Sequence, residues 1–221
     1  MKLSFRCVRS AVFAAAVSLA LTSCVSTPEP PGFAPTASLP AEPRPPAAQR
    51  EELPPLIAEA LSALEEHSTQ VVHQDRIAVV DFSLPSSKPR FHIVDVTTGQ
   101  IERSWLVAHG SGSDPTGSGM VESFSNQRGS HATSRGAYLT ANSYHGKYGR
   151  SQHLIGLDPE NDNAMDRAIV IHGAPYVASA LIPSQGRIGR SQGCFAFELG
   201  EVGTVMNILG EGRMIYAGKP A

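Results

Sequence analysis

Two runs in the C-terminal part of the chain decide how its fold is interpreted: AIVIHG at 168–173 and GRSQGC at 189–194. The first is apolar and β-branched, which predicts a strand, and it leads to His172. The second ends on Cys194, next to a glycine, Gly193, that lets another molecule approach the backbone closely. A thiol and an imidazole are the minimum set for nucleophilic acyl transfer, in which the imidazole takes the thiol proton and later returns one to the leaving amine. The two runs therefore predict a cysteine–histidine site on a β-rich scaffold.

Further strand-like segments surround this pair. They are rich in β-branched and aromatic residues and occupy 76–82, 90–96, 101–108, 138–141 and 213–217. Apolar residues at helical spacing predict a short amphipathic helix over 56–64 and a second helix over 199–209. We therefore expect a mainly β catalytic domain over 75–221, preceded at 53–74 by the first helix and a connection, with one or two helices covering the sheet.

The composition limits the possible partners. The chain has 221 residues, 41% of them hydrophobic, and a formal net charge of −2, which argues against an electrostatic grip on nucleic acid. Three cysteines are too few for a disulfide scaffold. No His-Glu-x-x-His or Cys-x-x-Cys group is present, and Asp158, Asn161 and Asp162 lack the spacing of a calcium loop, so no metal site is expected. His67 and His73 are expected to face water.

The N-terminal residues carry targeting signals. A basic start is followed by an apolar run at 11–21, which is too short to span a bilayer but has the length of a secretory h-region. The sequence LTSC that ends at Cys24 resembles a bacterial lipobox. We therefore expect a lipoprotein signal peptide at 1–23 and lipidation of Cys24. The alternative is an ordinary cleavable signal in which Cys24 is incidental.

The stretch 24–52 is rich in proline and predicts an extended, disordered linker between the lipid anchor and the domain. This organisation places the protein outside the cytoplasm, in the bacterial cell envelope. Val25 rather than aspartate follows the lipidated cysteine. That residue favours the periplasmic face of the outer membrane over the inner membrane in a host that has both.

A tract rich in glycine and serine runs from His109 to Gly119. It is not a phosphate-binding loop, because no Gly-Lys-Ser/Thr follows it and no helical pattern begins at its end. We interpret it as a mobile surface loop. The alternative is a loop beside a substrate cleft, since loops carry function more often than the elements they connect.

The pair of runs resembles the YkuD-type murein L,D-transpeptidase catalytic domains, whose signature is His-Gly followed by Ser-x-Gly-Cys. Here the signature reads His172-Gly173 and Ser191-Gln192-Gly193-Cys194. The resemblance covers residues 75–217 and is closest to one branch of the family. The segments that carry it are 81–87, 107–110, 124–126, 129–131, 145–149, 156–158, 161–164 and 186–191.

The resemblance implies a β-sandwich-type fold without a metal or organic cofactor, acting on peptidoglycan stem peptides. Such enzymes attack the L,D amide between meso-diaminopimelate and D-alanine and pass the acyl group to an amine of another stem. Cys194 is then the nucleophile and His172 the base, with a thiol pKa lowered below ~8.5 by the imidazolium. The resemblance also implies that Ser191 supports the cysteine or binds substrate, that the Gly173 carbonyl orients the imidazole, and that the N–H groups of Gly193 and Cys194 hold the oxyanion.

Five residues are expected along the substrate cleft: His109, His131, Tyr144, Arg190 and Gln192. Arg190 is a candidate to meet a stem carboxylate, with a solvated surface arginine as the alternative.

The sequence departs from the family at two places beside the thiol. Gln192 stands where members commonly have His or Trp, and Phe195-Ala196 replaces the usual residues after the cysteine. These departures put the pocket and the choice of acceptor in doubt. Three functions therefore stay open: a lipid-anchored L,D-transpeptidase, an L,D-carboxypeptidase or amidase that uses water as acceptor, and a non-catalytic murein-binding lipoprotein.

Overall fold

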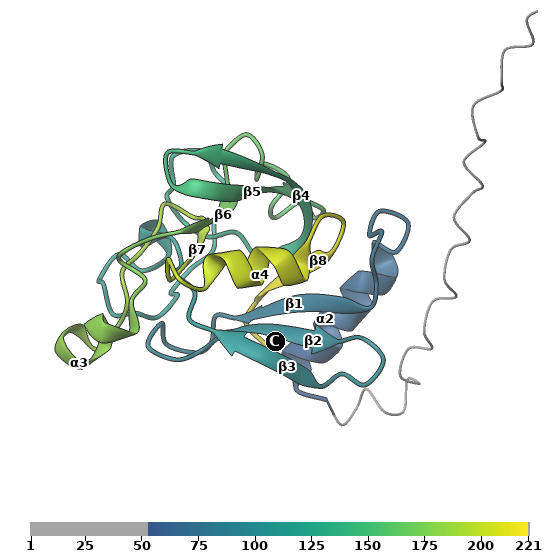
Figure 1. Cartoon of the computed structure of the whole chain (residues 1–221), viewed down its shortest axis with the longest axis horizontal. Helices are drawn as coiled ribbons and strands as arrows, with labels where there is room; N and C mark the ends of the chain where they lie inside the picture. Colours follow the sequence, from purple (N-terminus) through teal and green to yellow (C-terminus); the bar gives the residue numbers. More distant parts are fainter. Residues whose placement is uncertain (1–52, 221) are drawn as a thin grey trace, which may run out of the picture. The chain divides into compact units, whose positions relative to one another are not determined.

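Eight strands form one hydrogen-bonded sheet within residues 53–220, the part of the chain that the computed structural model describes (Figure 1). The strands are β1 (Arg76–Asp81), β2 (Phe91–Asp95), β3 (Ile101–Trp105), β4 (Gly136–Gly146), β5 (Gly149–Gly156), β6 (Val170–Gly173), β7 (Phe195–Phe197) and β8 (Met214–Gly218). The helices are α2 (Pro55–Glu66), α3 (Ile182–Gln185) and α4 (Val202–Leu209), with short 3-10 turns η1 (Ser111–Ser113) and η2 (Ser179–Leu181). The predicted mainly β fold class is confirmed, whereas the predicted signal peptide, Cys24 and linker lie outside the described residues.

The order of strands in the sheet is β3-β2-β1-β8-β4-β5-β6-β7. Neighbours are antiparallel except for the β1–β8 and β6–β7 pairs, which are parallel. Ala108, shortly after β3, forms an antiparallel bridge with Ala196 of β7. The segment that follows the first strand of the sheet order thus pairs with the last strand, β7. The layers therefore come from one strongly curved sheet, with β4 and β5 on one side of α4 and β1 to β3 on the other (Figure 1).

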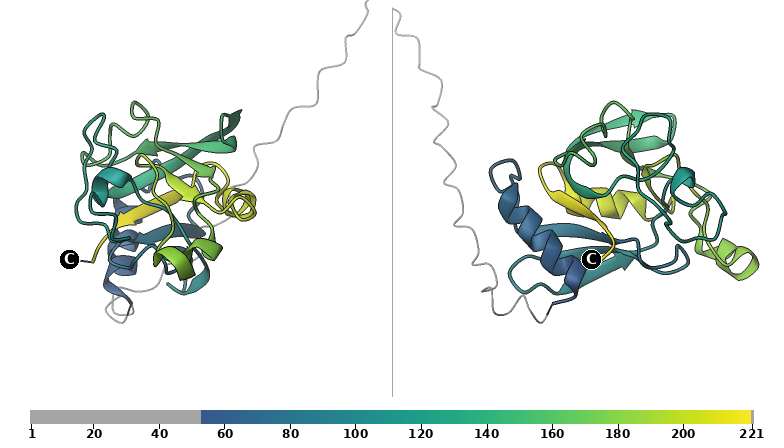
Figure 2. Two further views of the ribbon diagram at one scale, coloured as in Figure 1. Left: turned by 90° about the vertical axis from the view of Figure 1, so that its left-hand side faces the viewer. Right: turned by 180° about the vertical axis from the view of Figure 1, so that it is seen from behind.

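Successive side chains along the strands point to opposite faces of the sheet and pack into two separate hydrophobic cores. On β1, Ala78 and Val80 face a central core inside the curve, which α4 fills with Val205, Met206 and Leu209. Ile77 and Val79 face the other side of the sheet, where they pack against α2. Figure 2 shows α2 lying across this outer face, in contact with β1, β4 and β8.

The helix predicted over 56–64 is confirmed as α2. Its Leu56, Ile57, Ala60, Leu61 and Leu64 are all buried, and Pro55 occupies the first turn, where its missing N–H costs no helical hydrogen bond. The second predicted helix begins later than expected, at Val202, and Leu199, which was counted on its buried face, lies before it and is 60% exposed. None of the helices between residues 53 and 220 is long and apolar enough to cross a membrane.

Candidate active site

The parallel pair β6–β7 brings His172 and Cys194 to one face of the sheet. In the register of this pair, Ile171 lies opposite Phe195. Extending the register by one residue toward the N-terminus sets Cys194 opposite Val170. Side chains two residues apart on a strand share a face, so Cys194 and His172 project to the same side. Ile171 and Phe195 project to the other side and are fully buried in the central core. Because Ile171 and Phe195 are buried on one side, the two reactive side chains are directed to the opposite side.

Both side chains open into a cavity of about 550 Å³. Its lining consists of Arg128, Gly129, His131, Tyr148, Asp166, Arg167, Ala168, His172, Tyr176, Arg190, Ser191, Gln192 and Cys194. Two of these, His131 and Ala168, have positive φ angles of 53° and 52°, which in the described chain no other non-glycine residue adopts. Such left-handed backbone costs roughly 1–2 kcal/mol per residue and concentrates at functional sites. The strain therefore marks this cavity as a site held in shape by its surroundings.

His172 is held in one tautomer. Its Nδ1 lies 3.0 Å from the carbonyl oxygen of Gly173, and because a carbonyl can only accept, Nδ1 carries the proton. Nε2 is then left with a lone pair that accepts a proton. The ring is 2% exposed, and burial lowers the pKa of His172, partly opposed by the hydrogen bond to Gly173. The imidazole is therefore neutral near pH 7 and available as a base.

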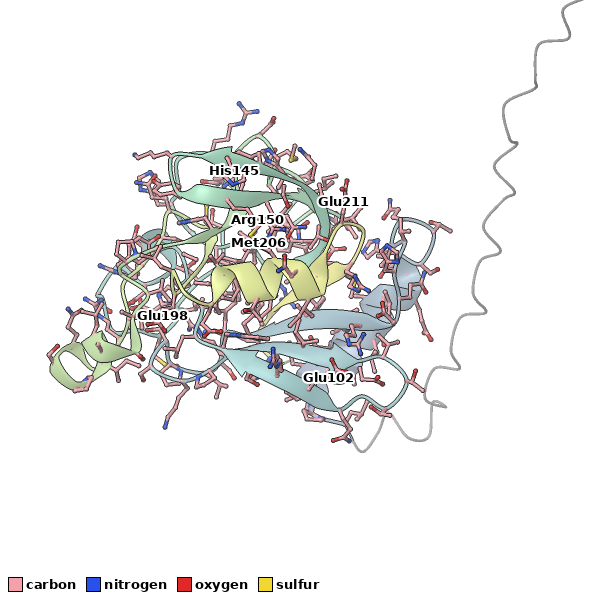
Figure 3. The ribbon with its side chains drawn as sticks, in the orientation of Figure 1. Glu102, His145, Arg150, Glu198, Met206 and Glu211 are labelled. Atoms are coloured by element: carbon pink, nitrogen blue, oxygen red, sulfur yellow. The ribbon has the colours of Figure 1, made fainter. Side chains whose placement is uncertain are left out.

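The ring of Tyr148 stacks on His172, with centroids 4.5 Å apart and an angle of 25° between the planes. Tyr148 lies at the tip of the hairpin formed by β4 and β5 and is itself 51% exposed. His145 and Arg150 form a cross-strand pair just before and after this tip (Figure 3). The hairpin therefore covers one face of the imidazole and leaves its edge toward the cavity.

Burial favours the neutral thiol form of Cys194. Its Sγ donates to the carbonyl oxygen of Ala168, at 3.5 Å. Burial raises the pKa of Cys194, while the Val170 amide and the Arg167 guanidinium oppose this shift only in part. Burial therefore moves both groups toward their neutral forms, in the direction opposite to the expected thiolate and imidazolium.

Ser191 fixes the turn that carries the cysteine. Its hydroxyl donates to the carbonyl oxygen of Cys194 at 2.7 Å and accepts the N–H of Gly193 at 3.1 Å. The predicted role of the Gly193 N–H as an oxyanion donor is thus not supported, because that N–H already points at Ser191. Gly193 has a φ of 113°, and an added Cβ would lie 2.7 Å from the Ala132 carbonyl oxygen. Glycine is required at this position for conformation and space.

Of the five residues expected along the cleft, His131, Arg190 and Gln192 line the cavity. His109 does not, because it is fully buried between Arg90 and Asp114. Burial and the Arg90 charge lower the pKa of His109 to about 4. Tyr144 is not part of the cavity lining either, since it stacks on His153 at 4.3 Å on the hairpin. His109 is therefore too buried to bind substrate, and the structure does not place Tyr144 in the lining of this cavity.

The Gly/Ser-rich tract is ordered around Asp114, so its interpretation as a mobile surface loop is wrong. Asp114 is fully buried, and its carboxylate accepts the N–H and hydroxyl of Ser118 and the N–H of Gly119. Arg90 Nη2 can only donate, so His109 Nδ1 accepts from it, and His109 Nε2 donates to Asp114 at 3.2 Å. The backbone carbonyl of Asp114 accepts from Arg190. Buried hydrogen bonds therefore tie the tract to the wall of the cavity.

Sequence reasoning missed Tyr148, Tyr176, Arg167 and the rim pair of Arg128 with Asp166, all of which line the cavity. Arg167 donates to the carbonyl oxygens of Ser125 and Ala132, and so holds the neighbouring loop in place. An arginine directly before the strand that leads to His172 was a signal in the sequence. The partners of Arg167 could not be found from the sequence, because they lie 35 to 42 residues away in the chain.

No group of three or more His, Cys, Asp or Glu side chains within residues 53–220 is arranged to hold a metal ion. Asn161 is buried, and its side chain bonds the backbone of Ala137 and Asp158. His67 does not face water as expected, since its Nε2 lies 2.7 Å from Asp158 Oδ1. These residues connect α2 to the sheet.

The fold and the site define a class: a curved β-sheet domain with an imidazole on one strand and a thiol directly before the adjacent parallel strand. The family model of the L,D-transpeptidase catalytic domain matches residues 49–217. The chain belongs to this family, as the resemblance of its signature predicted. A comparison with curated proteins gives no match.

Among solved structures, the chain is similar to an L,D-transpeptidase from Mycobacterium tuberculosis H37Rv, at 13% identity over 66% of this chain and 58% of that chain, with a TM-score of 0.41. It is also similar to the helical cell shape determining protein Pgp2 from Campylobacter jejuni, in its K307A mutant, at 15% identity over 80% of this chain and 57% of that chain, with a TM-score of 0.42. The chain thus spans less than two thirds of the length of these proteins.

Proposed function

We propose that this protein is a cysteine acyl-transferase that acts on the L,D amide of peptidoglycan stem peptides. The observation that carries the proposal is that His172 of β6 and Cys194, directly before the adjacent strand β7, line one cavity. Family membership supports the substrate class.

The reaction follows from the protonation states. The Cys194 sulfur attacks the amide carbonyl carbon while His172 Nε2 takes the thiol proton. The carbonyl oxygen becomes an oxyanion, for which the Cys194 N–H is a donor in the turn. When the C–N bond breaks, His172 returns the proton to the leaving amine and a thioester remains. An amine of a second stem then attacks the thioester, which forms a new amide and restores the thiol.

The charge of the cavity favours an anionic substrate. Arg128, Arg167 and Arg190 lie in its wall, whereas Asp166 is the one carboxylate of the lining and pairs with Arg128; Asp114, behind the wall, lies 4.0 Å from Arg190. Peptidoglycan stems carry free carboxylates, so this lining is complementary to them.

The departures from the family pattern do not remove the site. Phe195 and Ala196 are fully buried and are not part of the cavity lining, so neither side chain contacts a substrate directly. Gln192 is exposed on the cavity wall and is the departure that faces a substrate. A thiol and an imidazole of fixed tautomer that line one cavity favour catalysis over the alternative of murein binding alone.

Product analysis tests the proposal. Incubated with a disaccharide tetrapeptide, the protein is expected to release D-alanine and form cross-linked dimers. D-alanine and tripeptide without dimers would assign water as the acceptor and make the protein an L,D-carboxypeptidase. Unchanged substrate would contradict an acyl-transferase and leave murein binding.

We also propose that the protein is anchored to a membrane through lipid on Cys24, on the periplasmic face of the outer membrane. The support is the short h-region followed by LTSC. Replacing Cys24→Ala is expected to move the protein from the membrane fraction to the soluble fraction, measured by fractionation of the envelope. The matched control is Cys7→Ala, which lies in the predicted signal peptide and is expected to leave fractionation unchanged. Membrane association that persists in Cys24→Ala would contradict lipidation.

A further inference from the structure

We propose that Arg190 binds the free α-carboxylate of the residue that leaves the stem peptide, and so restricts the enzyme to amides at a chain terminus. This inference rests on the proposed function. It goes beyond it by stating which group of the substrate is recognised and by which side chain. A protein linked to murein through a side-chain amide would lack that group next to the scissile bond.

Arg190 has hydrogen-bond donors free for a ligand, and it differs from Arg128, which is 69% exposed and paired with Asp166, in being only 25% exposed. Arg167 donates to the backbone and to serine hydroxyls of the loop 125–134. Arg128 pairs with Asp166. Arg190 donates through Nη1 to the Asp114 backbone carbonyl, and its Nε and Nη2 have no acceptor among residues 53–220. A guanidinium with two adjacent donors matches the two oxygens of a carboxylate.

The position of Arg190 is built into the fold. The segment that precedes the cysteine bridges the Gly/Ser-rich tract, since the Ser191 N–H donates to the His109 carbonyl and the Ser111 N–H donates to the Ser191 carbonyl. Asp114, which accepts from Arg190, is itself fixed by bonds from Ser118 and Gly119. A side chain held in this way loses little conformational entropy when it binds a ligand.

The charge of Arg190 is only partly compensated within the protein. The nearest carboxylate oxygen is Asp114 Oδ2, at 4.0 Å from Arg190 Nη1. That oxygen already accepts the Gly119 N–H and lies 3.2 Å from His109 Nε2. The Arg190 side chain is 25% exposed, toward the cavity that holds the thiol. It can therefore reach a carboxylate that enters this cavity.

The substrate carboxylate nearest to the reacting atoms is that of the leaving residue. It is separated from the scissile carbonyl carbon by one nitrogen and one Cα. Arg190 stands four residues before Cys194 in the chain, directly before the turn that the Ser191 hydroxyl closes onto the Cys194 carbonyl. Arg190 and Cys194 line the same cavity, so we infer that a substrate carbonyl placed at the sulfur leaves its carboxylate in the part of the cavity that Arg190 lines.

The experiment compares two stem tetrapeptides, one with a free terminal carboxylate and one with a terminal carboxamide. The wild-type protein is expected to favour the carboxylate by roughly 10- to 100-fold in kcat/KM, the range of hydrogen bonds between charged groups. In Arg190→Gln this preference is expected to fall to about threefold or less, with turnover of the carboxamide unchanged. Arg190→Lys, which keeps the charge without the fork, is expected to restore part of the preference.

Arg187→Gln is the matched control. A methyl group placed on Gly117 would lie 3.5 Å from Arg187 Nη2 and 3.6 Å from Arg190 Nη2, so both arginines face the same loop. Only Arg190 belongs to the cavity wall, so Arg187→Gln is expected to leave the preference unchanged. Equal loss of both substrates in Arg190→Gln would overturn the proposal, because it would show a structural role. A preference that depends on a different carboxylate of the stem would also overturn it.

A binding measurement separates this inference from the proposed function. Cys194→Ala cannot form the thioester, and it is titrated with both peptides. If Cys194→Ala binds the carboxylate peptide more tightly than the carboxamide peptide, and adding Arg190→Gln removes this difference, the carboxylate site is supported. This holds even if the wild type turns over neither peptide. Equal binding of the two peptides would overturn the inference even if the wild type transfers acyl groups.

Discussion

Cys194→Ser is expected to reduce turnover of a tetrapeptide by about 1,000-fold or more. The thioester splits amide exchange into two lower barriers, and Cys194 is the free cysteine that the structure places in the cavity. A serine hydroxyl fits the same space but is a far poorer nucleophile for a neutral imidazole base. The measurement is release of D-alanine, with thermal unfolding to show that the variant folds.

The intermediate is also directly observable. Acid quenching during turnover, followed by mass spectrometry, is expected to show the tripeptide acyl group on the peptide that contains Cys194. A carbapenem, which acylates such thiols, is expected to modify the same peptide, and neither adduct should form in Cys194→Ser. Wild-type turnover by the serine variant would defeat covalent catalysis through this residue.

Most strands of the sheet that carries the site were predictable, because the pattern of apolar residues within each strand specifies it. Alternating apolar residues on β1 and β8 specify both faces of the sheet, and the run that ends on His172 specifies β6. Two strands were missed. β5 carries Arg150, Ser151 and Gln152, a polar pattern whose burial depends on the hairpin around it, and β7 has only three residues after Cys194.

The surroundings of the site were predicted less well, because long-range contacts override local composition. A tract rich in glycine and serine is typical of a mobile loop, but Asp114 within it is buried and satisfied by neighbouring N–H groups. The partner of that carboxylate, His109, hydrogen-bonds Arg90, 19 residues earlier. Likewise, Tyr148 reaches His172 only because β4 and β5 form a hairpin that extends over β6. Neither contact follows from periodicity.

His172→Gln is expected to reduce acyl transfer at pH 7 by about 100- to 10,000-fold, the usual contribution of a general base. Burial lowers the pKa of His172, so the wild-type base stays neutral at pH 7 and loses activity only as the pH falls through a value below 6.5. Burial raises the pKa of Cys194, so the thiol keeps its proton at neutral pH and needs the base. As the pH rises toward the thiol pKa, more thiolate forms without help. The deficit of His172→Gln is therefore expected to shrink at high pH, as measured by kcat/KM profiles of both proteins.

Alkylation by iodoacetamide distinguishes this mechanism from a preformed thiolate–imidazolium pair. With a neutral pair, the alkylation rate of Cys194 follows its own raised pKa, keeps rising above neutral pH, and changes by no more than about threefold in His172→Gln. A preformed ion pair would instead give a plateau near neutral pH that disappears in the variant. His153→Gln is the matched control, since His153 stacks on Tyr144 as His172 stacks on Tyr148 but lies outside the cavity lining. That variant is expected to match the wild type in both measurements. A neutral-pH plateau that is lost only in His172→Gln would show that the imidazolium stabilises the thiolate despite the burial of both groups.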